Sequence, residues 1–210
     1  YHFAVVQSEI ISYFAPCHTD TFDRIFLNVC ATKGSAEGEV GPAGAVWAQG
    51  GTLLMEAGAE IRSMVGRAIY ADGGNITIGG KIHDITGDAD MWQGNLKQKT
   101  LPGVALHLRN GAVGSMSAIG EITDIKGSEN AVFATGESVR FTMEHGSKIH
   151  DFANLYGVYM AYGKLYMDGE ISKLSKAVAV SLNDGAAGEI QSKGFIHDNQ
   201  CATAVVYLRG

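Results

Sequence analysis

The tripeptide Ile-His-Asp occurs three times in this 210-residue chain, and histidine is a residue type that can transfer protons or bind a metal. Its histidines are His83, His150 and His197, and the related segments 121–124 (Glu-Ile-Thr-Asp) and 170–173 (Glu-Ile-Ser-Lys) lie between them. If each segment is one layer of a stacked repeat, successive histidines are about 10 Å apart. Zinc ligands lie about 2 Å from the metal. We therefore predict a structural role for this tripeptide and assign no catalytic residue.

The aspartates Asp84, Asp124 and Asp151 fall in three consecutive segments, each two residues after an isoleucine. Stacked carboxylates about 5 Å apart repel one another unless N–H groups or a cation compensate the charge. Their oxygens suit Ca²⁺, but aspartate also suits a corner because it tolerates left-handed backbone and bonds neighbouring N–H groups. The corner role is our first interpretation, and Ca²⁺ is the one cofactor that the sequence leaves open.

A recurring isoleucine defines the element that must position these side chains. Four of the five gaps between successive copies, of 21, 40, 27, 22 and 25 residues, suit one coil of three short strands. Repeats of this length are typical of solenoids. We expect the copies to form one interior ladder, with each coil stacked on the last: Ile61, Ile82, Ile122, Ile149, Ile171 and Ile196.

Two further columns of strand-like runs complete the coil. The first recurs seven times, from 45–48 to 204–208, and the second runs from 52–55 to 164–167 and weakens near 187–190. The sequence therefore predicts an all-β, right-handed parallel β-helix of about six coils over residues 41–210. The 40-residue gap predicts a loop insertion at about 86–102. Residues 1–40 do not fit the repeat and are predicted to be an N-terminal cap or an irregular first coil.

Three runs carry a family resemblance: Phe-Thr-Met-Glu-His-Gly-Ser-Lys-Ile at 141–149, Gly-Val-Tyr-Met at 157–160 and Leu-Tyr-Met-Asp-Gly-Glu-Ile at 165–171. They resemble the repeats of right-handed parallel β-helix proteins of the pectate-lyase-like superfamily, and most of all those of bacterial cell-surface repeat proteins. The resemblance covers residues 41–210. It implies an exported bacterial protein with an extracellular or cell-surface location. It does not imply an activity, since one fold hosts many functions.

Three functions are compatible with this resemblance. The first is a non-enzymatic structural or adhesive solenoid that presents loops to a glycan or a host or partner protein. The second is a polysaccharide lyase or hydrolase. Lyases of the superfamily use acidic side chains to bind Ca²⁺ and also need a positioned Arg or Lys as base, whereas Arg62 and Lys173 lie toward opposite ends of the third column and Arg140 lies in another strand. The third is a filament subunit that stacks end to end.

Aromatic residues supply two candidate contact sites. Trp92 stands among polar residues in the predicted insertion, and an aromatic anchor in a long loop is a common hot-spot arrangement. Aromatic residues also recur in the first column: Trp47, Tyr70, Phe133, Tyr159 and Tyr207. They can pack in the core or on the outer face, and they can also stack on sugar rings.

Composition narrows the classes of partner. The formal net charge of −6, with no cluster of Lys and Arg, argues against nucleic acid. No apolar run approaches the roughly 18 residues of a membrane span. Of the three cysteines, Cys17 and Cys30 can pair in an oxidising compartment or remain buried thiols, and no cysteine forms a Cys-x-x-Cys motif.

Overall fold

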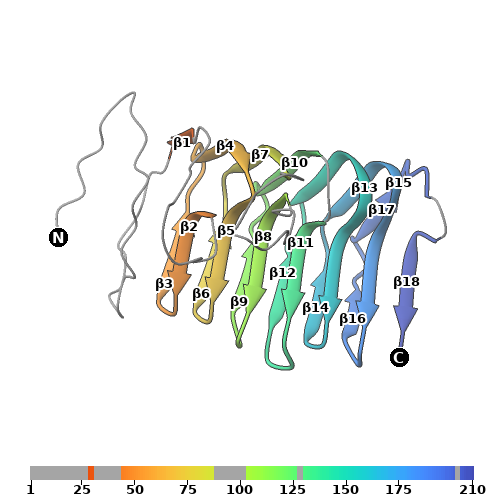
Figure 1. Cartoon of the computed structure of the whole chain (residues 1–210). Coiled ribbons are helices and arrows are strands. Elements are labelled where there is room, and N and C mark those ends of the chain that lie inside the picture. Colours follow the sequence, from red (N-terminus) through yellow and green to blue (C-terminus); the bar gives the residue numbers. More distant parts are fainter. Residues whose placement is uncertain (1–27, 31–43, 88–102, 127–129, 202–203) are drawn as a thin grey trace, which may run out of the picture.

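The computed structural model describes residues 28–30, 44–87, 103–126, 130–201 and 204–210. These residues form parallel strands joined by turns and include no helix, so none of them forms an apolar helix long enough to cross a membrane. Successive coils lie side by side along the molecule (Figure 1). The predicted all-β solenoid is therefore confirmed.

The strands fall into three columns. The second-column strands form a six-stranded parallel sheet: β3 (Thr52–Met55), β6 (Asn75–Ile78), β9 (Val113–Met116), β12 (Arg140–Met143), β14 (Lys164–Met167) and β16 (Ala187–Ile190).

The first and third columns share a twelve-stranded sheet, because two long strands, β13 (Lys148–Ala161) and β15 (Glu170–Asn183), run from the third column of one coil into the first column of the next. The other first-column strands are β2 (Gly44–Gln49), β5 (Arg67–Asp72), β8 (Val104–Arg109), β11 (Asn130–Thr135) and β18 (Val206–Arg209). The other third-column strands are β1 (Asn28–Cys30), β4 (Glu60–Val65), β7 (Lys81–Thr86), β10 (Glu121–Lys126) and β17 (Phe195–His197).

The recurring isoleucines lie opposite one another in a single ladder from Ile61 to Ile196. All are fully buried except Ile196 in the last coil, which is partly buried. Ladders of Ile, Leu, Val, Met and Ala from the other two columns fill the rest of the interior. Because every strand pairs with its copy in the next coil, the backbone bonds and the apolar core run continuously along the molecule.

A residue in the left-handed region follows the isoleucine of each third-column strand from β4 to β17 and forms a corner of the coil. It stands two positions after the isoleucine and has φ between 52° and 56°: Ser63, Asp84, Asp124, Asp151, Lys173 and Asp198. Where β7 pairs with β10, this residue has no strand partner, and pairing resumes at the next position. Aspartate tolerates this region better than most L-residues. The presence of Ser63 and Lys173 shows that the corner, rather than the carboxylate, is common to all coils.

Three segments singled out by the sequence lie partly outside the described residues. The predicted insertion falls between β7 and β8, and its residues 88–102 are outside. Of residues 1–40, only β1 is described, and it pairs with β4 in the register of the third column. Cys17 and the side chain of Cys30 are outside as well, whereas Cys201 is a free thiol.

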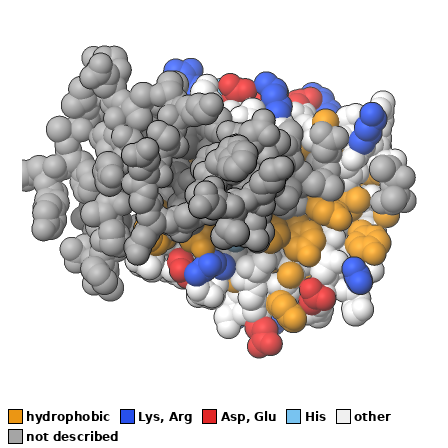
Figure 2. Space-filling model, viewed as in Figure 1, with side chains coloured by type: hydrophobic (Ala, Val, Ile, Leu, Met, Phe, Trp, Pro, Cys, Tyr) orange, Lys and Arg blue, Asp and Glu red, His pale blue; other side chains and the backbone are white. Residues whose placement is uncertain are grey.

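The last coil exposes apolar side chains that its predecessors bury. Ile190 is 47% exposed and Leu208 is 70% exposed, whereas their partners Met167 and Leu182 are buried. Hydrophobic side chains accordingly gather toward the C-terminal end of the view in Figure 2.

Candidate functional site

Charged side chains of alternating sign follow the outer surface of the third column. The residue before each isoleucine is Glu60, Lys81, Glu121, Lys148 and Glu170 in successive coils, and these residues face one another in register. Opposite charges directly across a strand pair stabilise a sheet. Acidic and basic side chains lie together along the upper edge of the molecule in Figure 2.

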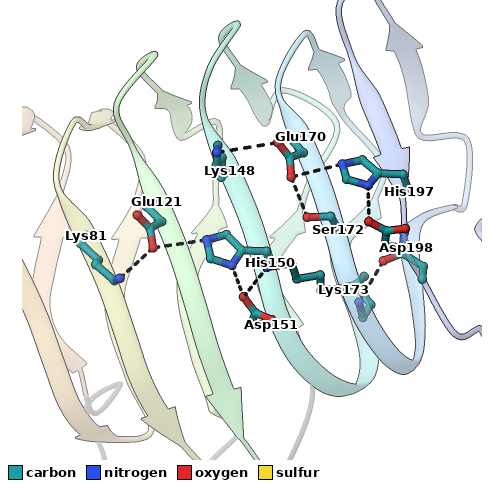
Figure 3. Close-up of polar contacts among 12 residues, drawn as sticks. Lys81, Glu121, Lys148, His150, Asp151, Glu170, Ser172, Lys173, His197 and Asp198 are labelled. Carbon is teal, nitrogen blue, oxygen red and sulfur yellow. Dashed lines mark hydrogen bonds and ion pairs between the residues drawn. The ribbon is translucent and has the colours of Figure 1, made fainter.

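Each histidine of the repeated tripeptide binds the glutamate of the preceding coil. His83 Nε2 contacts Glu60, and the His150 and His197 Nε2 atoms lie 3.2 Å and 3.3 Å from the Oε1 atoms of Glu121 and Glu170. Figure 3 shows the last two of these pairs side by side. The sequence alone places the histidines two coils apart, but it does not reveal that each reaches back to a carboxylate one coil away.

Lysines form ion pairs between the neighbouring coils that no histidine–glutamate contact connects. Lys81 Nζ lies 2.7 Å from Glu121 Oε1, and Lys148 Nζ lies 3.9 Å from Glu170 Oε2 (Figure 3). Together with the histidine contacts, these ion pairs link Glu60 to His197 through six successive coils. We call this chain of contacts the charge ladder.

These contacts change the acidity of the carboxylates. The hydrogen bond from His83 lowers the pKa of Glu60, and the hydrogen bond from the Ser172 hydroxyl, followed by the charge of Lys148, lowers the pKa of Glu170. Burial is the largest single effect on Glu121 and acts to raise its pKa, but Lys81 and His150 together outweigh it and the pKa is lowered. The glutamates of the charge ladder are therefore held ionised.

The three aspartates considered as Ca²⁺ ligands have different surroundings. Asp84 accepts hydrogen bonds from Ser63 Oγ at 3.2 Å and Lys126 Nζ at 3.1 Å. Asp151 lies 2.6 Å from His150 Nδ1 and 3.7 Å from Lys173 Nζ (Figure 3). Asp124 is exposed. Among the described residues, no group of three or more His, Cys, Asp and Glu side chains is arranged to hold a metal ion. Ca²⁺ binding at these aspartates stays a prediction.

The cations considered as a catalytic base lie in separate places. Arg62 Nε is 3.6 Å from Glu60 Oε2, and Lys173 pairs with Asp151 across a corner. Arg140 begins β12 in the six-stranded sheet. Trp92, the predicted loop contact, lies outside the described residues, so its role stays a prediction.

A second ladder, of aromatic rings, follows the outer surface of the first column. Tyr70 and His107 pack edge to face with ring centroids 4.8 Å apart, His107 and Phe133 do the same at 4.8 Å, and Phe133 stacks on Tyr159 at 5.3 Å. Trp47 lies opposite Tyr70 in register, and Ser181 separates Tyr159 from Tyr207.

His107 also belongs to this ladder, although a histidine among apolar residues does not stand out in the sequence as part of an aromatic column. Its side chain is 8% exposed, and its Nδ1 atom has no hydrogen-bond partner among the described residues. Burial, assisted by the charges of Arg67 and Arg109, lowers the pKa of His107 to about 3. The ring is therefore neutral at physiological pH and packs between Tyr70 and Phe133 as an uncharged ring.

The outer side of the six-stranded sheet carries a third set of outward-facing rows. In each strand from β3 to β14 the second and fourth residues are buried, and the first and third face outward. Thr77 Oγ1 and Ser115 Oγ lie 3.1 Å apart on this surface, and Arg140 stands directly opposite Lys164. We call this surface the six-stranded face.

The fold and these repeated outward rows define a parallel β-solenoid. No protein-family model matches the chain, and no curated protein or solved structure does.

Proposed function

We propose that this chain is a non-enzymatic structural or adhesive solenoid of an extracellular or cell-surface protein, and that it presents its side to a glycan or a partner protein. The relationship to the pectate-lyase-like superfamily and to bacterial adhesins is part of this proposal. It is supported by the resemblance of the repeat runs at 141–149, 157–160 and 165–171.

The six-stranded face is the observation that carries the proposal. Its outward side chains lie in straight rows, one residue per coil, with neighbouring strands about 4.8 Å apart. A polymer of sugar units or an extended peptide also repeats at regular short intervals, so successive units can meet successive coils. The rows thus suit a linear ligand better than a compact one.

Rigidity is the second requirement of such a platform, and the two ladders supply it. The charge ladder joins neighbouring coils from Glu60 to His197, and the interior isoleucines stack beneath it. A platform held in this way loses little conformational freedom on binding, which favours affinity.

Binding without turnover tests the proposal. The full chain is applied to an array of neutral and acidic glycans, with and without Ca²⁺, and the products are assayed for new reducing ends and for unsaturated sugars. We expect retention of a glycan with no product. New reducing ends or unsaturated products would instead establish a polysaccharide hydrolase or lyase.

A further inference from the structure

We propose that His150 and His197 make the stability of the solenoid depend on pH near neutrality. Each ring lies between two carboxylates, one at each ring nitrogen, and binds both of them only when both nitrogens carry a proton. Mild acidification therefore strengthens the contacts between neighbouring coils of the third column. This property is independent of the proposed adhesive function.

His150 lies between carboxylates of two strands. Its Nδ1 atom is 2.6 Å from Asp151 Oδ2 in the same strand, and its Nε2 atom is 3.2 Å from Glu121 Oε1 in β10. Figure 3 shows the ring between these two side chains. The side chain is 19% exposed, so water only partly screens the two contacts.

The two carboxylates determine which protonation state of the ring fits. An ionised carboxylate only accepts hydrogen bonds, whereas a neutral imidazole donates through one nitrogen and presents a lone pair at the other. The hydrogen bond from His150 lowers the pKa of Asp151, and in Glu121 burial acts to raise the pKa but is outweighed by Lys81 and His150. Both carboxylates are thus ionised. A neutral ring would point a lone pair at one of them, so only the doubly protonated, positively charged ring satisfies both contacts.

Other charged side chains lie on the strands around His150: Glu121, Asp124 and Lys126 on β10, Lys148 and Asp151 on β13, and Glu170, Lys173 and Lys176 on β15. Lys126 and Lys148 are paired with carboxylates of other coils. Lys173 lies 3.7 Å from the same Asp151 that His150 binds. The ring nitrogens of His150 therefore face carboxylates rather than cations.

His197 has the same arrangement in the last coil. Its Nδ1 atom is 2.9 Å from Asp198 Oδ2, and its Nε2 atom is 3.3 Å from Glu170 Oε1 (Figure 3). The strand that pairs with it, β15, also carries Lys173 and Lys176. Because the His197 side chain is 46% exposed, we expect its contribution to be the smaller of the two.

The third histidine of the repeat binds a carboxylate through one nitrogen only. His83 Nε2 contacts Glu60, whereas Asp84 accepts hydrogen bonds from two other side chains. A neutral ring that donates from Nε2 satisfies this single contact. We therefore assign the pH dependence to His150 and His197.

The sign of the pH dependence follows from proton linkage. A histidine of the unfolded chain loses one of its two ring protons at about pH 6.5. The folded protein holds this proton through the paired carboxylates, so the stabilisation is complete below about pH 6.5 and is lost as the pH rises above it. The contacts that join β10 to β13 and β15 to β17 are the ones that weaken in alkaline solution.

Urea titrations of the full chain at pH 5.5, 7 and 8.5 test the proposal with the wild type and the double variant His150→Gln/His197→Gln. Glutamine keeps an amide donor but does not take up a proton in this range. The ratio of the unfolding constant of the variant to that of the wild type should be roughly threefold or more larger at pH 5.5 than at pH 8.5. Comparison of the two proteins at each pH cancels the contribution of other titrating groups, His107 included.

His145→Gln is the matched control, since His145 is exposed in the turn after β12 and lies outside the charge ladder. Its unfolding constant relative to the wild type should not change with pH. Nitrogen-15 NMR of the wild type is a second readout that needs no variant. At pH 7 a larger fraction of His150 rings than of His145 rings should carry protons on both nitrogens.

Three results would overturn the proposal. One is a ratio for the double variant that stays constant or falls as the solution is acidified. Another is a ratio that changes with pH by the same factor for the double variant and for His145→Gln. The third is equal protonation of His150 and His145 in the NMR spectra.

Discussion

Asp124 shows what the corner position demands of a single residue. Its side chain is exposed and its φ is 53°, so backbone conformation rather than packing determines which residues fit. We predict that Asp124→Val lowers the free energy of unfolding by about 1–2 kcal/mol, because the left-handed region costs most L-residues about this much, whereas the short polar side chain of aspartate tolerates it. Urea denaturation measures the change.

Asp124→Asn is the control for this substitution, since asparagine tolerates the same backbone region. It should unfold at nearly the wild-type urea concentration. If Val and Asn behave alike, the corner does not impose the constraint inferred from φ.

His107 predicts a pH dependence. Its pKa of about 3 lies below the value of 6.5 expected in the unfolded chain, so the unfolded state binds a proton first as the pH falls. The stability due to the neutral ring is therefore complete above about pH 6.5 and is lost as the pH falls toward 3, by at most about 1.4 kcal/mol per pH unit. His107→Phe should remove most of this loss between pH 6.5 and 5. Urea titrations at several pH values measure it, and an unchanged slope in the variant would contradict the prediction.

At the scale of the strands, the interior ladder is predicted to dominate stability. Ile149→Ala leaves a cavity at a fully buried position, so we expect a loss of about 2–5 kcal/mol in the free energy of unfolding. Ile119 is 62% exposed in a turn, and Ile119→Ala should change stability by no more than about 0.5 kcal/mol. Equal effects of the two substitutions in thermal or urea denaturation would contradict the stacked core.

The charge ladder predicts acid sensitivity in a lower pH range. The folded pKa values of Glu60, Glu121 and Glu170 lie below the ordinary value of 4.5, so their stabilisation is present above this pH and is lost as the pH falls below it. Glu121→Gln, which removes the glutamate that contacts both Lys81 and His150, should reduce the loss of stability between pH 4.5 and 3.

Glu137→Gln serves as the control for this acid titration, because Glu137 is exposed and lies outside the charge ladder. Its acid sensitivity should match that of the wild type. Equal acid sensitivity of Glu121→Gln and Glu137→Gln would show that the charge ladder does not stabilise the fold.

The sequence predicted the ladder of Ile61 to Ile196 and its corners because both arise from local patterns that repeat in every coil. It could not predict the contact between His150 and Glu121, since that contact depends on which coil lies next and how far each side chain reaches. His107 escaped notice because its partners Tyr70 and Phe133 lie in other coils.

At the scale of the whole molecule, the third column and the six-stranded face differ in how their charged side chains are paired. The third column neutralises its own charges through the charge ladder, whereas the six-stranded face leaves two adjacent cations and a groove exposed. The proposed function therefore predicts that substitutions on the six-stranded face change binding and leave the free energy of unfolding nearly unchanged.

Hydrogen–deuterium exchange of the full chain, with and without a saturating concentration of a glycan that the array retains, tests most directly whether the six-stranded face is the binding platform. We predict added protection in β12, β14 and the turns that line the groove, with no change in β7 or β10 on the third column. Added protection on the third column alone, or at no described strand, would contradict the proposal.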